Sequence, residues 1–246
     1  NDINDPPIIT SGDSYNVDEN QTDFYITDIN LDDGDVENLQ LILELTVSNG
    51  VLELSETDDI TCLEGGNCYS TASNMQFRGT LDVLNNSISN LHYVPDQNFN
   101  GLDVLVIRLN DMGNVGDEEL EDIKNININV EAVNSPPYIS SDAFYNAFED
   151  SLFTIENISL EDVDVDEGDG VLQLAINCPD CKVSLDLPIQ GIDFGCGECE
   201  GNGFENNLMV FRGGLSDIND AIENLDIISN QNFCGQTTMQ ITANDL

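Results

Sequence analysis

Seven cysteines are the most reactive side chains in this chain of 246 residues, and four of them form two CxxC pairs. Cys178 and Cys181 make the first pair, and Cys196 and Cys199 make the second, with fourteen residues between the pairs. Such an arrangement holds a zinc ion through four thiolates in a reducing compartment and forms disulfides in an oxidising one. Four cysteines allow three disulfide pairings, and the sequence leaves these open.

The other cysteines indicate which compartment applies. Cys62 and Cys68 lie in one polar stretch, where a disulfide between them would close a single loop. Cys234 makes the count odd, so it is expected to be free or bonded to another chain. Because this cysteine usage is typical of oxidising compartments, we expect disulfides in preference to zinc.

Three Asn-x-Ser/Thr sequons point to the same compartment: Asn20, Asn85 and Asn157 are candidate glycosylation sites. Asn20 and Asn157 are expected near turns or loops, and Asn20 is the best candidate. Asn85 has a structural alternative, because a later copy of the same motif keeps Asn219 without a sequon. Sequons and cysteines together predict an extracellular, secreted protein.

The charge balance is extreme, with 48 acidic residues against 5 basic ones and a formal net charge of −43. This charge excludes nucleic acid as a partner, because phosphate binding needs Lys and Arg, and it disfavours anionic lipid surfaces. No apolar run is long enough to span a membrane, so no membrane insertion is expected. Divalent cations are the natural partners. The alternative is that the acidity only keeps an extracellular protein in solution.

Catalysis has little support in the sequence. His92 is the only histidine, and it lies between Leu91 and Tyr93 in an expected strand, where a surface position is favoured over a general base. The chain has no nucleophile motif and no phosphate-binding glycine loop. We therefore expect no catalytic residue, no organic cofactor and no enzymatic activity in this chain.

An internal repeat organises the sequence. Residues Phe77 to Asp111 recur as Phe211 to Asp245 at an offset of 134 residues, sharing Phe-Arg-Gly, Gln-Asn-Phe-x-Gly and a closing Asn-Asp. Asn134-Ser-Pro-Pro likewise matches Asn4-Asp-Pro-Pro. The sequence therefore predicts two domains, residues 1–133 and 134–246.

Short strands are the expected elements of both domains. Residues 39–47 place Leu39, Leu41, Leu43, Leu45 and Val47 on one face with a period of two, and Asn49-Gly50 signals a hairpin. We expect an all-β fold of two tandem Ig-like β-sandwiches, with about seven strands each and at most one helical turn near residues 83–91. Residues 178–204 form a Cys-rich insert. The second repeat lacks the counterpart of the strand at 126–130, which leaves an exposed edge.

Four motifs carry a resemblance to a known family. Asn4-Asp-Pro-Pro7, Phe77-Arg-Gly-Thr80, Asn98-Phe-Asn-Gly101 and Asn110-Asp-Met-Gly-Asn114 resemble the cadherin-like tandem repeats of large extracellular surface and filament proteins. The resemblance spans nearly the whole chain. It implies β-sandwiches strung end to end with Ca²⁺ at the junctions, as in adhesins, matrix proteins and the hairs of algal and flagellate cells.

The resemblance also implies three calcium sites. One would join the two repeats through Glu19, Asn110, Asp111, Asn134, Asp162 and Asp164. A second, before the first repeat, would use Asn4, Asp5, Asp33 and Asp35, and a third, after the second repeat, would use Glu149, Asn244 and Asp245. The alternative is that these are solvated turn residues, because Asp and Asn are favoured in turns.

These features predict a structural repeat module of an extracellular filament, surface hair (mastigoneme-like) or cell-wall assembly, stiffened by disulfides, glycans and junction calcium. Its partners would be other copies or repeats of the same protein. One alternative is a calcium-dependent cell-surface adhesin. Another is a set of accessory modules of a secreted hydrolase, which would need a catalytic domain outside these residues.

Overall fold

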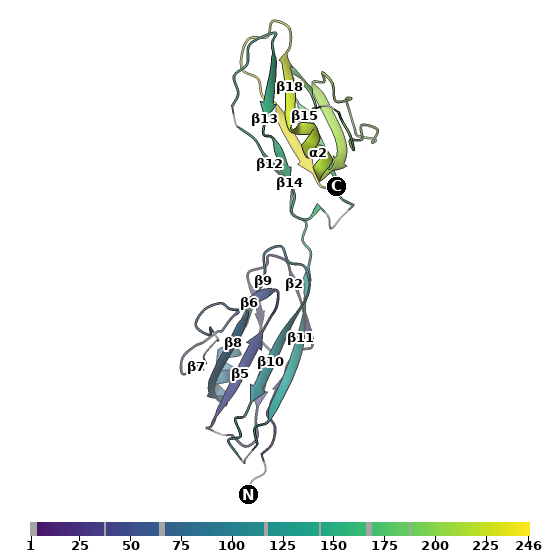
Figure 1. Cartoon of the computed structure of the whole chain (residues 1–246). Helices are drawn as coiled ribbons and strands as arrows, with labels where there is room; N and C mark the ends of the chain where they lie inside the picture. The colour runs from purple at the N-terminus through teal and green to yellow at the C-terminus, as the bar shows by residue number, and fades with distance from the viewer. Residues whose placement is uncertain are drawn as a thin grey trace. The chain divides into compact units, whose positions relative to one another are not determined.

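The structure is a computed structural model that describes residues 4–36, 38–63, 67–115, 118–142, 144–165, 169–186 and 188–246. The chain divides into two compact units, Asn1–Val133 and Asn134–Leu246, which are described separately (Figure 1). Almost all regular structure in both units is β-strand, which confirms the predicted all-β class.

Unit 1 contains eleven strands and one helix within its described ranges: β1 (Ile8–Thr10), β2 (Ser14–Asp18), β3 (Phe24–Ile26), β4 (Asn30–Asp32), β5 (Gln40–Thr46), β6 (Gly50–Glu53), β7 (Thr61–Cys62), β8 (Asn74–Thr80), α1 (Leu81–Ile88), β9 (Leu91–Pro95), β10 (Gly101–Asn110) and β11 (Glu121–Glu131). The larger sheet has the order β2-β11-β10-β5-β8-β7, and the smaller one has the order β3-β9-β6. β1 and β4 form a separate antiparallel pair.

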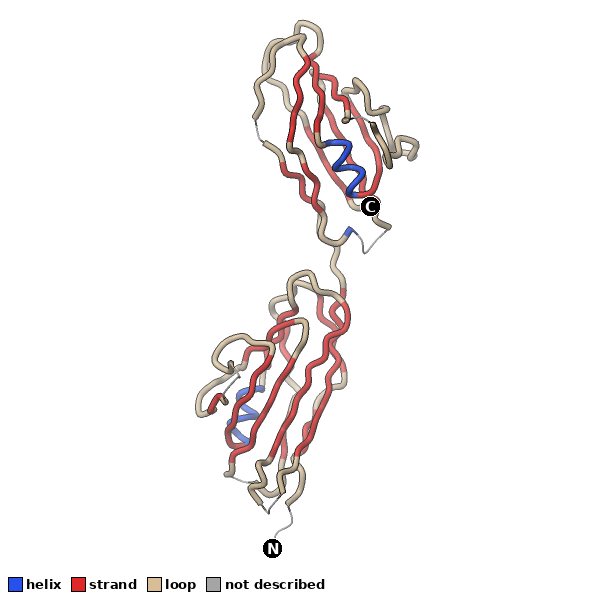
Figure 2. Tube along the Cα trace, viewed as in Figure 1, coloured by secondary structure: helices blue, strands red, loops and turns tan. Residues whose placement is uncertain are grey.

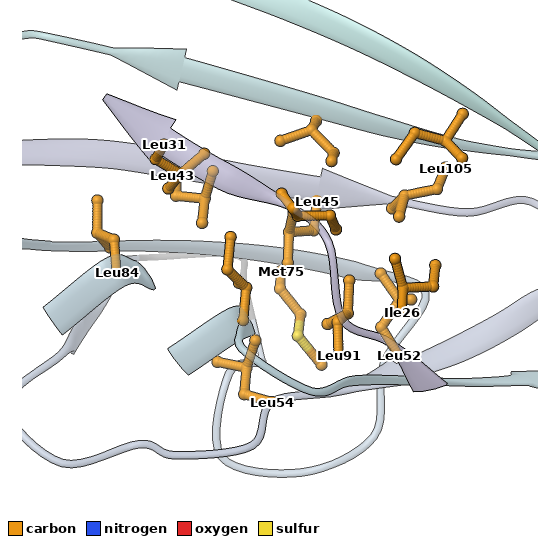
Figure 3. Packing of buried hydrophobic residues seen from close by; sticks show 14 of the residues in the cluster. Ile26, Leu31, Leu43, Leu45, Leu52, Leu54, Met75, Leu84, Leu91 and Leu105 are labelled. Carbon is orange, nitrogen blue, oxygen red and sulfur yellow. The ribbon is translucent and has the colours of Figure 1, made fainter. Parts of the chain in front are cut away.

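The core of unit 1 is filled from both sheets. Leu43, Leu45 and Leu105 come from the larger sheet, Leu52 and Leu91 come from the smaller one, and all five are fully buried in one cluster (Figure 3). Side chains that alternate between core and exterior along each strand produce this two-layer arrangement. The fold is therefore consistent with the predicted β-sandwich.

The predicted period of two is present in β5, with one exception at its start. Leu41, Leu43 and Leu45 are fully buried, and Val47 follows them into the core. Leu39 lies before the strand and is 41% exposed, so its assignment to the buried face was wrong. The strand gains its partners β8 and β10 only from Gln40 and Ile42 onward.

Unit 2 contains β12 (Tyr138–Ser140), β13 (Leu152–Glu156), β14 (Ser159–Glu161), β15 (Val171–Asn177), β16 (Cys181–Ser184), β17 (Leu208–Gly214), α2 (Leu215–Ile222), β18 (Asn224–Ser229) and β19 (Gln240–Asn244). Its sheets have the orders β17-β15-β19, β13-β18-β16 and β12-β14. These match β8-β5-β10, β3-β9-β6 and β1-β4 of unit 1.

Each unit carries an eight-residue helix after its Phe-Arg-Gly strand, which is longer than the single turn expected (Figure 2). Leu84 and Ile88 of α1 lie one turn apart and are both buried. Gly79 lets the helix lie close to β8, because a Cβ there would come within 2.9 Å of the Val83 side chain. Among the described residues, no helix is long and apolar enough to cross a membrane.

A buried carboxylate fixes the turn between β5 and β6. The hairpin predicted at Asn49-Gly50 was wrong, because these strands do not pair with each other: β5 lies in the larger sheet and β6 in the smaller one. Asp103, only 1% exposed, accepts hydrogen bonds from the backbone N–H groups of Ser48 (3.0 Å) and Asn49 (3.1 Å). Its Oδ2 also accepts the hydroxyl of Tyr93 at 2.9 Å. A Cβ on Gly50 would come within 2.6 Å of the Tyr93 ring, so this turn tolerates only glycine. Burial beside Asp103 raises the pKa of Tyr93, which keeps its hydroxyl protonated as a donor.

Candidate functional site

Four side chains meet where the chain leads into unit 1: Asn4, Asp33, Asp35 and Asp111, which we name carboxylate cluster 1. Asn4 Nδ2 donates to Asp111 Oδ2 at 2.6 Å, a contact between residues 107 positions apart. The backbone N–H of Asp35 donates to Asp33 Oδ1 at 3.3 Å. Asp111 Oδ1 accepts the backbone N–H groups of Gly113 (2.9 Å) and Leu120 (2.8 Å), which holds its carboxylate in place.

Two aspartates of cluster 1 are buried, which is unusual for charged side chains. Asp111 is fully buried and Asp33 is 7% exposed. Three buried oxygens have no hydrogen-bond partner among the described residues, namely Asn4 Oδ1, Asp33 Oδ2 and Asp35 Oδ1. Because water does not reach these acceptors, their lone pairs are uncompensated, which costs free energy unless a proton or cation supplies the missing charge.

The pKa values of the carboxyl groups in cluster 1 are shifted by this burial and by their proximity to one another. Burial raises the pKa of Asp33 to about 6, and the neighbouring carboxylates of Asp35 and Asp111 add to the shift. The pKa of Asp35 is lowered, first by the hydrogen bond that its Oδ2 accepts from the backbone N–H of Asp5 at 2.9 Å. One carboxylate of the pair is therefore disfavoured as an anion and the other is favoured.

Unit 2 contains an equivalent group, carboxylate cluster 2: Asn134, Asp162, Asp164 and Asp245. Asn134 Nδ2 donates to Asp245 Oδ2 at 2.7 Å, as Asn4 does to Asp111. Burial raises the pKa of Asp162 to about 6, with Asp164 and Asp245 adding to the shift. Asp162 Oδ2 and Asp164 Oδ1 are again buried without a partner in the described residues.

The expected groups of site residues misplaced Asp111 and Asp245, although Asn4 lies with Asp33 and Asp35, and Asn134 lies with Asp162 and Asp164, as the sequence grouped them. Asp111 lies with Asn4 and Asp33 inside unit 1, and Asp245 lies with Asn134 and Asp162 inside unit 2. The reason is strand direction. β10 is ten residues long, or about 30 Å, and carries the chain back to the edge where β5 begins.

Glu19 lies at the other end of β10 and so cannot share a site with Asp111. Its backbone N–H donates to the carbonyl of Glu131 at 2.8 Å, and its Oε2 accepts from Asn100 Nδ2 at 3.4 Å. Asn100 and Glu131 lie next to the pair Gly101–Val130, at one end of the β10–β11 ladder. Asp111 lies next to the pair Asn110–Glu121, at the other end of that ladder. Glu19 is 5% exposed, and its Oε1 has no partner among the described residues.

Of the remaining expected ligands, Asp5, Asn110 and Asn244 are chain neighbours of cluster residues, whereas Glu149 lies near the end of β18, where the adjacent Asp150 donates its N–H to Ser229. Asp5 is exposed and contacts cluster 1 through its backbone. Asn110 Oδ1 accepts the N–H of Met112 at 2.7 Å, and Glu149 and Asn244 are exposed. Across the described ranges, no group of three or more His, Cys, Asp or Glu side chains stands ready to hold a metal ion. Amide and backbone oxygens would have to complete any cation site.

The cysteines form disulfides, as expected for an oxidising compartment. Cys62 pairs with Cys68, Cys178 with Cys181, and Cys196 with Cys199. The two CxxC pairs thus close separate turns and do not converge on a zinc ion. The first follows β15, and the second lies in a loop whose Phe194 packs 5.4 Å from Phe211 of β17. Cys234 is exposed and has no disulfide partner.

The three sequons occupy different environments. Asn20 and Asn157 are exposed and adopt positive φ in turns, at +59° and +65°. Asn85 is part-buried on α1, where its Nδ2 donates to the carbonyls of Leu31 (2.9 Å) and Leu81 (3.1 Å). Asn219 makes the same two contacts in unit 2, to Leu160 and Leu215. A sugar on Asn85 would displace one of these bonds, which favours the structural interpretation.

We expect Asn20→Gln and Asn157→Gln each to remove one glycan from protein made in a glycosylating host, whereas Asn85→Gln leaves the glycan mass unchanged. Asn85→Ala should lower the free energy of unfolding of unit 1 by about 1–3 kcal/mol, because it leaves the Leu31 backbone groups unpaired. Intact mass spectrometry and urea unfolding check both results. Asn219→Ala is the matched control for stability, since it lacks a sequon. A glycan on Asn85 would contradict this assignment.

Comparisons with known proteins give little further information. No known protein family matches the sequence, and no curated protein matches it. Similar solved structures include a variant of an endo-fucoidan hydrolase from glycoside hydrolase family 107 (13% identity, TM-score 0.27, 98% of this chain and 27% of that one). Drosophila N-cadherin EC1-4 is also similar (12% identity, TM-score 0.28, 99% of this chain and 51% of that one).

The chain thus spans about a quarter of the hydrolase and about half of the N-cadherin fragment. TM-scores this low carry no argument about ancestry or activity. What the chain does must therefore be inferred from its own residues.

Proposed function

We propose that this chain is a structural repeat segment of an extracellular filament or cell-surface assembly, and that calcium binds the two carboxylate clusters. The observation that carries the proposal is the pair of equivalent clusters, each with a nearly buried aspartate that has a carboxylate oxygen without a partner among the residues described. These are Asp33 in cluster 1 and Asp164 in cluster 2. Three disulfides and the acidic composition support an extracellular setting.

The donor chemistry favours calcium over other metals. Each cluster offers carboxylate and amide oxygens only, without imidazole or thiolate groups. Ca²⁺ takes six to eight such oxygens in flexible geometry, whereas Mg²⁺ demands a near-ideal octahedron and zinc favours nitrogen or sulfur. In cluster 1 the three aspartates and Asn4 Oδ1 would supply ligands, and backbone carbonyls and water would complete the shell.

The mechanical consequence follows from where the clusters lie along the chain. Asn4 and Asn134 belong to the segments that lead into units 1 and 2, and each is hydrogen-bonded to the aspartate that follows β10 or β19. A cation bound to both partners would hold the leading segment against its unit. In an array of such units, fewer accessible linker conformations would make the array stiffer.

Calcium titration of the 246-residue chain tests the proposal. We expect isothermal titration calorimetry to show at least two bound Ca²⁺ per chain, with Asp111→Ala and Asp245→Ala each removing one. Magnesium at the same concentration should bind more weakly. If millimolar calcium neither binds nor changes thermal unfolding relative to a chelator, the clusters are not calcium sites and the acidity serves solubility.

Cys234 offers a route to association between copies, because it is exposed and carries no disulfide. We expect air-oxidised protein to give a dimer band on a non-reducing gel, which disappears with Cys234→Ser or with reductant. A variant lacking both Cys196 and Cys199 is the control, because it keeps Cys234. A dimer that persists in Cys234→Ser would show that another cysteine links the chains.

A further inference from the structure

The last strand of unit 2 is only half covered. Ile241 and Ala243 of β19 correspond to Ile107 and Leu109 of β10 by the offset of 134 residues. The β10 residues are fully buried, whereas those of β19 remain partly exposed. In unit 1, β10 lies between β5 and β11; among the described residues, β19 pairs with β15 alone.

The length of β19 reflects the same difference in pairing between the two units. β10 pairs with β11 from Gly101 to Asn110 but with β5 only from Val106 onward. Residues 101–105 are therefore held in the sheet by β11 alone. Their counterparts, residues 235–239, are not in a strand, and β19 begins at Gln240.

The segment of unit 2 that matches β2, the other neighbour of β11, is likewise not in a strand among the described residues. Residues 144–148 correspond to β2, because Tyr145 contacts Phe153 at 5.9 Å much as Tyr15 contacts Phe24 at 6.0 Å. β2 pairs in parallel with β11, but residues 144–148 form a loop (Figure 2). Phe144 and Phe148 are each 86% exposed there.

The segment 235–241, which includes the start of β19, and residues 144–148 border one groove of about 1230 Å³. Its wall includes Phe144, Phe148, Ile155, Ile227, Met239 and Ile241. At the matching place in unit 1, β11 inserts Ile126, Ile128 and Val130, which are 0%, 0% and 4% exposed. The groove is thus the space that three alternating apolar side chains fill in the first unit.

We propose that this groove is a binding site for a β-strand built like β11 when such a strand is joined to β19 by a turn like the one between β10 and β11. The strand pairs antiparallel with β19, extends β19 back through residues 235–239, and pairs in parallel with residues 144–148. It presents apolar side chains at three alternate positions, opposite Gly235, Thr237 and Met239 by the β10–β11 register. Its occupancy covers Phe148 and extends the sheet of unit 2 that matches the larger sheet of unit 1.

An extended chain tests this assignment. Leu246 corresponds to Met112, so the extension appends the sequence of residues 113–131 after Leu246. We expect amide hydrogen exchange to slow at least about tenfold over residues 144–148 and 235–244, because new ladder hydrogen bonds form. Binding of a hydrophobic dye should fall as the exposed aromatic side chains become covered.

The control is the same extension with its three apolar positions, taken from Ile126, Ile128 and Val130, changed to aspartate, which leaves length and turn unchanged. Equal exchange in the two extended chains would overturn the proposal. So would an unextended chain that sediments as a dimer with residues 144–148 already protected, because a second copy would then occupy the groove.

Discussion

Asp33→Asn is expected to raise the free energy of unfolding of unit 1 by about 1 kcal/mol in a calcium chelator, and to abolish most of the stabilisation that calcium confers. Asp33 is nearly buried beside two other carboxylates, and Oδ2 lacks a partner among the described residues. Without a cation its charge is destabilising, and an amide removes that charge at constant volume. With calcium the same charge becomes a ligand, so its loss weakens binding.

The pH dependence has a definite sign. Because the pKa of Asp33 is raised to about 6, the folded state binds its proton more tightly than the unfolded state does. In chelator, this group therefore lowers stability as pH rises from about 4 to about 6, and the penalty stays constant above that. The advantage of Asp33→Asn should be absent below pH 4 and complete at pH 7.

Urea unfolding of the whole chain, followed by hydrogen exchange of β5 and β10 amides, reports unit 1 specifically. Calcium at 100 times its dissociation constant should add about 2.7 kcal/mol to the wild-type chain and much less to the variant. Asp58→Asn is the matched control, because Asp58 is exposed and far from the cluster in sequence. If both variants respond to calcium alike, Asp33 is not a ligand.

Asp103→Ala is expected to give the largest loss of stability in the chain, about 3–5 kcal/mol. The substitution leaves the N–H groups of Ser48 and Asn49 without their carboxylate acceptor, and it leaves the hydroxyl of Tyr93 with only the carbonyl of Asn49 at 3.4 Å. Water cannot easily replace the carboxylate beside Tyr93, because Tyr93 is fully buried. Much of unit 1 should therefore be unfolded at 37 °C.

A double-mutant cycle with Tyr93→Phe separates the hydroxyl contact from the contacts to the β5–β6 turn. We expect a coupling energy of about 1–3 kcal/mol between Asp103 and Tyr93, with the remaining loss assigned to the turn amides. Thr237→Ala is the control in unit 2, because Thr237 occupies the matching position but is exposed. Additive effects in the cycle would show that the carboxylate acts on the backbone alone.

Local patterns in the sequence determined the all-β class and the identity of most core positions. Leu41, Leu43 and Leu45 could be placed because side chains alternate along any strand. The hairpin predicted at Asn49-Gly50 was wrong, because a turn signal does not say which strands pair: β5 pairs with β8 and β10, whereas β6 pairs with β9. The predicted burial of Leu39 was wrong because alternation alone does not say where pairing begins. The length of α1 was underestimated because its buried face consists only of Leu84, Ser87 and Ile88.

Contacts between distant residues depended on the tertiary structure. Asn4 and Asp111 are 107 residues apart, and only the antiparallel direction of β10 brings them together, so the repeat motif was assigned to the wrong end of its unit. The role of Asp103 likewise has no local signal, because Tyr93 and the β5–β6 turn, which it holds, come from other parts of the chain. A sequence records which residues are apolar or charged along one dimension; which charges become buried together is decided when strands pair.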